Sequence, residues 1–347
     1  MGKRSDGFPR ADQSADLRRL KWLIPVILLV AAAAVGVGLL VRGSIRSRES
    51  LNVTAASNSN VSSGYRDVTW QGKHYRYNNL VTAILFAGLD SDGEMTEYSI
   101  YTKAPRADSI QLVILDQKNQ VIKVVGISRD TMTKIRKYAL DGMDRGLMRD
   151  HLGYAYTYGN GGAVSCESLC EAVSILFYNM PIRDYVVVNR SSLAALAEIV
   201  GPVEVVVPNN DLAELDEAYS QGQTVVIDAD NLEFYVRSRD TEVDFSNTSR
   251  MQRQQSYISA AMQKLLEKAA DDPAAVWDDL QQIESCMQTN ITRSRYLDLA
   301  STLKNVTYSD DNYLTLGGSE ATGSHDEFYP DEESLLALVM DLFYIEQ

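Results

Sequence analysis

Two arginine-rich segments near the middle of the chain carry side chains that can bind phosphate groups. The first, Tyr235–Asp240, holds Arg237 and Arg239, and the second, Arg250–Gln255, holds two more arginines and Gln254. A guanidinium group presents a planar fork of donors that matches phosphate oxygens. Because the chain carries a formal net charge of -14, this local cluster indicates an anion site rather than a generally basic surface.

Three further segments place acidic and basic residues next to apolar runs. Gly88–Ser91 and Ser128–Thr131 each follow an apolar run, and Arg106–Ser109 precedes one. Open α/β sheets bind ligands where strands end, so we expect the three segments to meet at one site. Taken singly, each could be a solvated Arg–Asp ion pair. Their number, together with the arginine segments, favours a functional site.

The residue types in these segments predict a diphosphate site with a metal. Asp90 and Asp108 can hold Mg²⁺ (or Mn²⁺), which is bound by a few carboxylates together with phosphate oxygens of a substrate. The arginines can then clamp the diphosphate and stabilise the charge that develops on it. They are Arg106, Arg129, Arg237, Arg239 and Arg250.

The pattern of apolar residues predicts an α/β fold, an α/β/α-type sandwich with a central mixed sheet. Strands are expected at 81–88, 110–115, 121–127, 184–188 and 203–207, with two short ones around Gly72. The second and third of these read as a hairpin. Helices are expected at 165–177, 191–200 and 250–269 and from Asp331 onward, whereas 230–236 reads as a short helix or strand.

One N-terminal transmembrane helix is expected before this sandwich. Trp22–Val41 is a run of twenty residues without a charge, which is long enough to span a bilayer. Residues 1–21 hold six basic and three acidic residues, which favours a cytoplasmic N-terminus and an extracellular catalytic domain. The run is longer than the apolar core of a cleaved signal peptide, so we predict a single-pass cell-membrane protein.

Composition divides the chain into five parts. We expect a cytoplasmic tail at 1–21, the transmembrane helix at 22–41 and a Ser/Asn-rich linker at 42–66. A catalytic domain follows at 67–270, and a C-terminal extension at 271–347 packs on its core. The acidic balance argues against nucleic acid as a partner. Cys166 and Cys170 read as small buried residues, although a disulfide is possible in an exported domain.

The ordered set of motifs resembles that of LytR–CpsA–Psr proteins, over about residues 80–265. The segments that carry the resemblance are Gly88–Ser91, Arg106–Ser109, Ser128–Thr131, Tyr154–Gly159, Val200–Pro208 and Arg250–Gln255. Each motif alone is weak evidence of the resemblance, and the occurrence of all six in this order is strong evidence. Arg106-Ala107-Asp108-Ser109 departs from the commoner Arg-Ser-Asp-Thr, and the segment between Asp240 and Arg250 is longer than usual.

The resemblance implies a membrane-anchored enzyme of the bacterial cell envelope. Such proteins transfer a glycopolymer, for example teichoic acid or capsule, from a polyprenyl diphosphate carrier to a peptidoglycan hydroxyl. The partners implied are the lipid-linked glycopolymer, peptidoglycan and the membrane. The apolar strands and the Cys166–Phe177 helix would line a groove for the lipid tail. Two alternatives remain: a polyprenyl diphosphate phosphatase, and a non-catalytic regulatory protein that binds lipid diphosphate.

The resemblance also assigns roles to the site residues. Asp90 and Asp108 would bind the metal. The catalytic residues would be Arg106, Asp108, Arg129 and Asp130. The diphosphate would be contacted by Arg106, Arg129, Arg237, Arg239, Arg250 and Gln254. We expect Asp130 to orient Arg129 rather than to act as a general base, because a neighbouring arginine lowers the pKa of a carboxylate.

Overall fold

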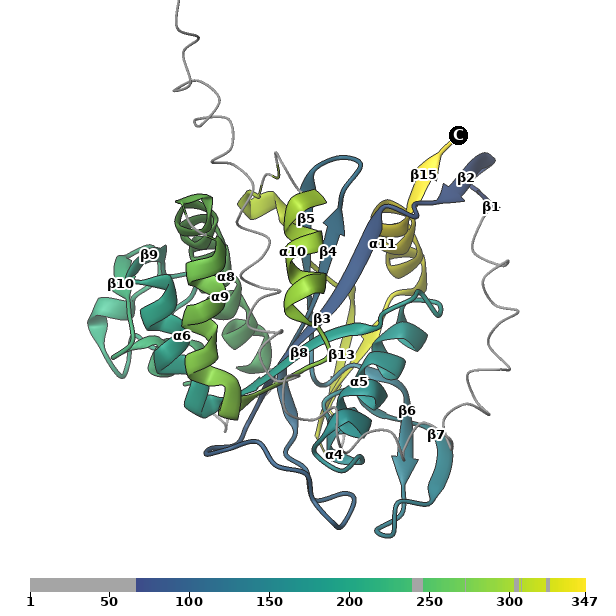
Figure 1. The fold of residues 1–347 in the computed structure, drawn as a ribbon, viewed down its shortest axis with the longest axis horizontal. Coiled ribbons are helices and arrows are strands. Elements are labelled where there is room, and N and C mark those ends of the chain that lie inside the picture. Colours follow the sequence, from purple (N-terminus) through teal and green to yellow (C-terminus); the bar gives the residue numbers. More distant parts are fainter. Residues whose placement is uncertain (1–66, 239–245, 272, 303–305, 307, 323–324) are drawn as a thin grey trace, which may run out of the picture.

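A six-stranded mixed sheet forms the centre of the molecule (Figure 1). The computed structural model describes residues 67–238, 246–271, 273–302, 306, 308–322 and 325–347. The strand order is β11-β8-β3-β4-β5-β12. In that order the strands are Met287–Thr289, Asp184–Asn189, Val81–Leu89, Ala107–Asp116, Val121–Ile127 and Tyr313–Thr315. β4 runs antiparallel to both β3 and β5, whereas β8 runs parallel to β3.

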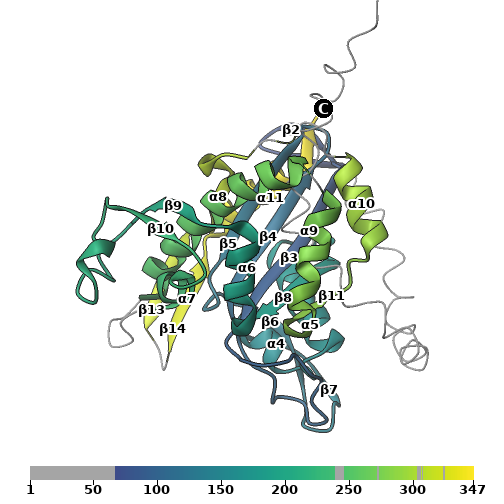
Figure 2. The same ribbon diagram turned by 60° about the vertical axis from the view of Figure 1, so that its left-hand side comes forward.

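Helices cover both faces of this sheet, because the strands carry apolar residues on both sides. In β3, Ile84 points into one core, and its neighbours Ala83 and Leu85 point into the other. The first face is covered by α6 (Leu193–Val200), α7 (Leu232–Arg237), α8 (Ser246–Asp271), α9 (Pro273–Leu280) and α10 (Arg293–Thr302). The second is covered by α4 (Tyr154–Thr157), α5 (Ala163–Leu176) and α11 (Glu332–Phe343). The predicted sandwich with a central mixed sheet is confirmed (Figure 2).

Four small sheets surround the central one. β1 (Asp67–Trp70) and β2 (Lys73–Tyr77) form the expected pair around Gly72, and β15 (Tyr344–Glu346) joins them. β6 (Met132–Tyr138) and β7 (Asp144–His151) form a hairpin that the sequence did not reveal. The predicted strand at 203–207 is β9 (Val203–Val206), but it pairs with β10 (Thr224–Ile227) in a separate two-stranded sheet. β13 (Gly318–Thr322) and β14 (Asp326–Pro330) form a second hairpin.

The C-terminal segment supplies both edges of the central sheet. β11 pairs with β8, and β12 pairs with β5, so the sheet is completed by residues after 271. The terminal helix begins where expected, because the Asp331 side chain accepts a hydrogen bond from the backbone of Ser334. The remaining short helices are η4 (Arg190–Ser192), η5 (Glu217–Tyr219), η6 (Gln281–Cys286) and η7 (Asp310–Asn312).

The predicted membrane helix, Trp22–Val41, lies outside the described residues, as do the N-terminal tail and the linker at 42–66. Within the part of the chain that is described, we find no helix with the length and apolarity needed to span a bilayer. The three cysteines are free thiols, and Cys166 and Cys170 are buried in α5 as expected.

Candidate active site

Strand directions bring the three predicted segments to one end of the sheet. β3 ends at Leu89, which lies opposite Ala107 at the start of the antiparallel β4. The backbone N–H of Asp90 donates to the carbonyl of Arg106 at 3.2 Å, so the first two segments touch. β5 is antiparallel to β4 and ends at Ile127, which places Arg129 at the same end.

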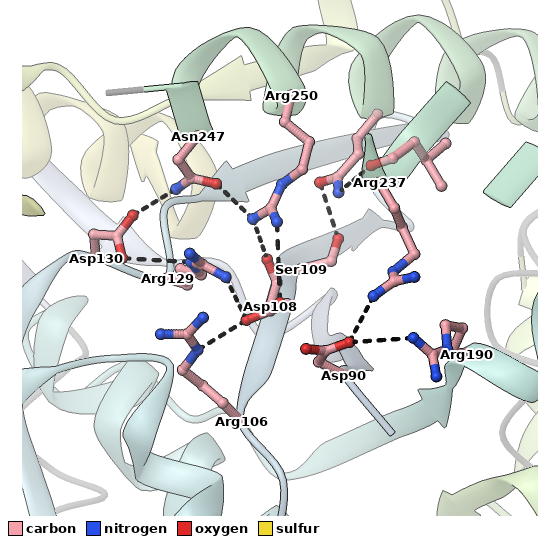
Figure 3. Close-up of polar contacts among 12 residues, drawn as sticks. Asp90, Arg106, Asp108, Ser109, Arg129, Asp130, Arg190, Arg237, Asn247 and Arg250 are labelled. Atoms are coloured by element: carbon pink, nitrogen blue, oxygen red, sulfur yellow. Dashed lines mark hydrogen bonds and ion pairs between the residues drawn. The ribbon is translucent and has the colours of Figure 1, made fainter. Parts of the chain in front are cut away.

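Three arginines surround Asp108 (Figure 3). Arg106 Nε and Arg129 Nη1 lie 2.9 Å and 2.6 Å from its Oδ1 atom, and Arg250 Nη1 lies 4.0 Å from Oδ2. Arg250 also donates to the backbone carbonyl of Asp108 at 3.0 Å. Burial favours the neutral carboxyl, but Arg129, Arg106 and Arg250 outweigh it and hold the pKa of Asp108 below its ordinary value. Asp108 is therefore an anion at neutral pH.

A second group of charges surrounds Asp90, on the other side of the site (Figure 3). Arg237 Nη2 lies 2.6 Å from Asp90 Oδ1, and Arg190 Nη1 lies 3.9 Å from the same atom. Glu233 accepts from Arg237 at 2.7 Å. Arg190 also pairs with Asp92. Sequence reasoning missed Arg190, although it directly follows the parallel strand β8 and so obeys the same strand-end rule.

Helix α8 carries a line of polar side chains across the site. Asn247, Arg250 and Gln254 are three and four residues apart, a spacing that places them on one face of a helix. Asn247, which the sequence did not reveal as a site residue, donates to Asp130 Oδ2 at 2.7 Å and accepts from Arg250 at 2.5 Å. Gln254 accepts from Ser109 at 3.1 Å and donates to the carbonyl of Val236, so it links β4, α7 and α8.

The two arginines of the Arg250–Gln255 motif have different positions. Arg253 has no exposed surface, and it donates to the backbone carbonyls of Tyr235 and Ser238 and to Asn209 and Asp211. It thereby fixes the end of α7, where Arg237 is located. Arg239, predicted to contact the diphosphate, lies outside the described residues.

A cavity of about 530 Å³ opens from the arginines into an apolar interior. Phe86, Val124 and Val188 of the sheet form its floor. Its remaining apolar lining comes from α6, α7, α8 and their flanks: Leu193, Leu196, Val200, Leu232, Val236, Tyr257, Ile258, Ala261, Met262 and Leu265. At the polar end Arg106, Arg129, Arg190, Arg237 and Arg250 face Asp90 and Asp108, a net formal charge of +3. Such a cavity can hold an anionic head group joined to an apolar tail.

The helix predicted to line this cavity does not reach it. α5, expected to contact the lipid tail, packs in the core on the opposite face of the sheet, with Cys166 and Phe177 fully buried. Tyr154 and Tyr156 belong to the short helix α4 on that same face, Tyr158 ends this helix, and Tyr156 is fully buried. The expectation for α5 is wrong because an apolar helix sequence does not say which of the two faces of the sheet the helix covers.

The absence of a side chain at Gly153 allows Arg106 and Arg129 to approach each other. We predict that Gly153→Ala strongly lowers the rate of the reaction at this site and lowers the free energy of unfolding only modestly. An added Cβ would lie 2.8 Å from the carbonyl oxygen of Ala107, 3.1 Å from Arg129 Cβ and 3.3 Å from Arg106 Cγ. Overpacking of this kind costs about 1–3 kcal/mol, and displaced catalytic groups can lower turnover by about 10²-fold. Turnover per folded molecule measures the effect.

The matched control for this prediction is Gly126→Ala, whose Cβ would collide with the Tyr313 ring without touching either arginine. It should destabilise the fold but preserve turnover per folded molecule. Equal turnover in the two variants would refute a positioning role for Gly153.

Comparison with known proteins identifies relatives of this chain. The sequence model of the LytR_cpsA_psr family matches residues 47–340. The polyisoprenyl-teichoic acid–peptidoglycan teichoic acid transferase TagU of Bacillus cereus is 28% identical over 228 residues. That match covers 64% of this chain and 64% of TagU, so the chain spans slightly less than two thirds of the curated relative's length.

Solved structures share the fold. TagV of B. subtilis superposes with a TM-score of 0.55 at 22% identity, covering 76% of this chain and 95% of TagV. The structure titled TagT bound to LI-WTA gives 0.55 at 19% identity, covering 76% of this chain and 90% of TagT. Because the family match extends over most of the sequence and the sandwich is the same, the chain belongs to the LytR_cpsA_psr family.

Proposed function

We propose that this chain transfers a glycopolymer from a polyprenyl diphosphate carrier to a hydroxyl group of peptidoglycan. One observation carries the proposal: a single cavity joins five arginines to an apolar interior. The arginines match the charge of a diphosphate, and the interior matches a polyprenyl tail. The names of the TagU relatives, teichoic acid transferases, support a wall glycopolymer as the group transferred.

The proposed reaction is a phosphotransfer at the phosphorus that carries the polymer. The acceptor oxygen forms a bond to this phosphorus while its bond to the bridging oxygen breaks. Polyprenyl phosphate departs and takes up the proton that the hydroxyl loses. Arg106, Arg129 and Arg250 would neutralise the charge that develops on the phosphoryl oxygens. Asp130 would orient these groups, because its carboxylate already accepts from Asn247 and lies 3.4 Å from Arg129 Nε.

The acidic residues of the site fit Mg²⁺ or Mn²⁺, provided that the substrate completes the coordination. No three His, Cys, Asp or Glu side chains in the described ranges are grouped closely enough to hold a metal ion by themselves. Asp90 and Asp108 nevertheless line the same cavity, and Mg²⁺ commonly takes two carboxylates, water and phosphate oxygens. We propose that these two side chains hold the metal, which would supply further neutralisation of the diphosphate.

The membrane location follows from the same proposal. A polyprenyl carrier is embedded in a bilayer, so the enzyme must work beside one. Trp22–Val41 would anchor the chain, with residues 1–21 in the cytoplasm and the catalytic domain outside.

The test is a transfer assay with purified full-length protein, lipid-linked glycopolymer, Mg²⁺ and peptidoglycan. We expect polymer attached to peptidoglycan, and little release of phosphate products when peptidoglycan is left out. Rapid hydrolysis without an acceptor would instead support the phosphatase. Tight binding of the lipid with no turnover would support the regulatory protein.

A further inference from the structure

A surface rich in aromatic and basic side chains adjoins the arginine cluster beside Arg106. It consists of Arg149, His151, Tyr154, His325 and Tyr329, from β7, α4 and the β13–β14 hairpin, and is called the aromatic surface below. The rings of His151 and Tyr154 lie 5.7 Å apart, and those of His151 and His325 lie 6.2 Å apart. The Arg149 guanidinium lies 5.1 Å from the centre of the Tyr329 ring.

Direct contacts connect the aromatic surface to the catalytic groups. The Arg106 guanidinium lies 5.7 Å from the centre of the Tyr154 ring. The backbone N–H of Phe328, on β14, donates to the carbonyl of Asp130 at 2.9 Å. His151 Nε2 lies 3.1 Å from the carbonyl oxygen of Asp326. The β13–β14 hairpin is therefore held beside Asp130, and the aromatic surface begins one side chain away from Arg106.

The geometry of phosphotransfer indicates which substrate approaches the arginine cluster from the side of the aromatic surface. In Figure 3, Arg237 and Arg190 lie on one side of Asp108, and Arg129 and Asp130 lie on the other. The apolar part of the cavity is lined by α6 and α7, the elements next to Arg190 and Arg237, and by the part of α8 beyond Gln254. The leaving polyprenyl phosphate would therefore occupy the Arg237 side. Because the attacking and leaving oxygens are roughly in line, the acceptor must enter from the Asp130 side.

We propose that the aromatic surface binds the acceptor, a peptidoglycan glycan strand, and presents its hydroxyl to the arginine cluster. This inference rests on the proposed function. The apolar face of a sugar ring can pack on the Tyr154 and Tyr329 rings, whose polar groups remain at the edge. The exposed side chains of Arg149 and His325 can bind the carboxylates and amides of the strand.

Binding of glycan strands by the full-length protein in detergent tests this inference without requiring turnover. The probe is uncross-linked glycan strands released from peptidoglycan, titrated calorimetrically. We expect Tyr329→Ala and His325→Ala each to weaken binding about tenfold, and Tyr329→Phe to retain it because the ring is kept. The control is Tyr178→Ala, an exposed tyrosine just after α5, at the opposite end of the sheet from the site.

Binding of farnesyl diphosphate to the same variants reports whether the diphosphate site is still folded, and it should be unchanged. The inference would be overturned if both alanine variants bound glycan strands with wild-type affinity. It would also be overturned if they lost affinity only for the donor glycopolymer. If strands bind as expected but the wild-type protein transfers nothing, the proposed function fails and the binding surface stands. If transfer occurs and neither alanine variant changes strand binding, the inference fails alone.

Discussion

Replacing Arg129 with alanine should reduce glycopolymer transfer by about 10³-fold, since an arginine that neutralises transferring phosphoryl groups contributes about that much. Arg129 is 7% exposed, lies 2.6 Å from Asp108 and lines the polar end of the cavity. Its removal takes away one of the arginines proposed to neutralise the phosphoryl oxygens. The protein should still fold, because Arg106 and Arg250 continue to neutralise Asp108. Single-turnover transfer of lipid-linked polymer measures the effect.

The matched control is Arg76→Ala, which removes an exposed arginine paired with Asp67 far from the site. Such surface pairs contribute about 0–1 kcal/mol, so its transfer rate should equal that of the wild type. Wild-type transfer by Arg129→Ala, and also by Asp108→Ala, would mean that this cluster is not the catalytic site.

Filling the cavity with Ala261→Phe should weaken binding of a long polyprenyl diphosphate by about 100-fold, because each methylene excluded from an apolar site forfeits about 0.8 kcal/mol. Ala261 is 6% exposed and lines the cavity on α8. It lies seven residues beyond Gln254, a rise of about 10 Å along the helix into the apolar interior. Dimethylallyl diphosphate, whose tail is too short to reach Ala261, should bind the variant as it binds the wild type.

Ala194→Phe adds the same side chain on the exposed side of α6 and serves as the control. It should leave both ligands unaffected. Equal loss of the long and the short diphosphate in Ala261→Phe would indicate a general disturbance of the site. Unchanged binding of the long one would mean that the tail lies elsewhere.

Much of the sheet could be predicted because its inner strands are continuous apolar runs. β3, β4 and β5 are nine, ten and seven residues long and have no exposed residue, so each appears in the sequence as a continuous apolar segment. The edge strands β11 and β12 have only three residues each, too few to carry a periodic signal. Their place in the sheet depends on pairing with β8 and β5, which the sequence does not specify locally.

In the candidate site, too, residues with a local sequence signal could be predicted, and residues whose positions depend on distant segments could not. Asp90, Asp108 and Arg129 were found because each adjoins a strand end. Asn247 was not found, because an asparagine near a helix start is commonplace, and its role depends on meeting Asp130 from a segment over a hundred residues earlier. Arg250 and Arg253 differ in their surroundings for a related reason: three residues apart on α8, one faces Asp108 and the other faces Asp211.

The central claim is that a lipid diphosphate occupies one continuous cavity with its head group among the arginines. A crystal structure of the protein with farnesyl diphosphate and Mn²⁺ tests it most directly. We predict that the tail lies along α6 and α8, that the diphosphate contacts Arg129, Arg237 and Arg250, and that an anomalous Mn²⁺ peak appears between Asp90 and Asp108. A tail bound against α5 on the opposite face, or a diphosphate away from these arginines, would contradict the account.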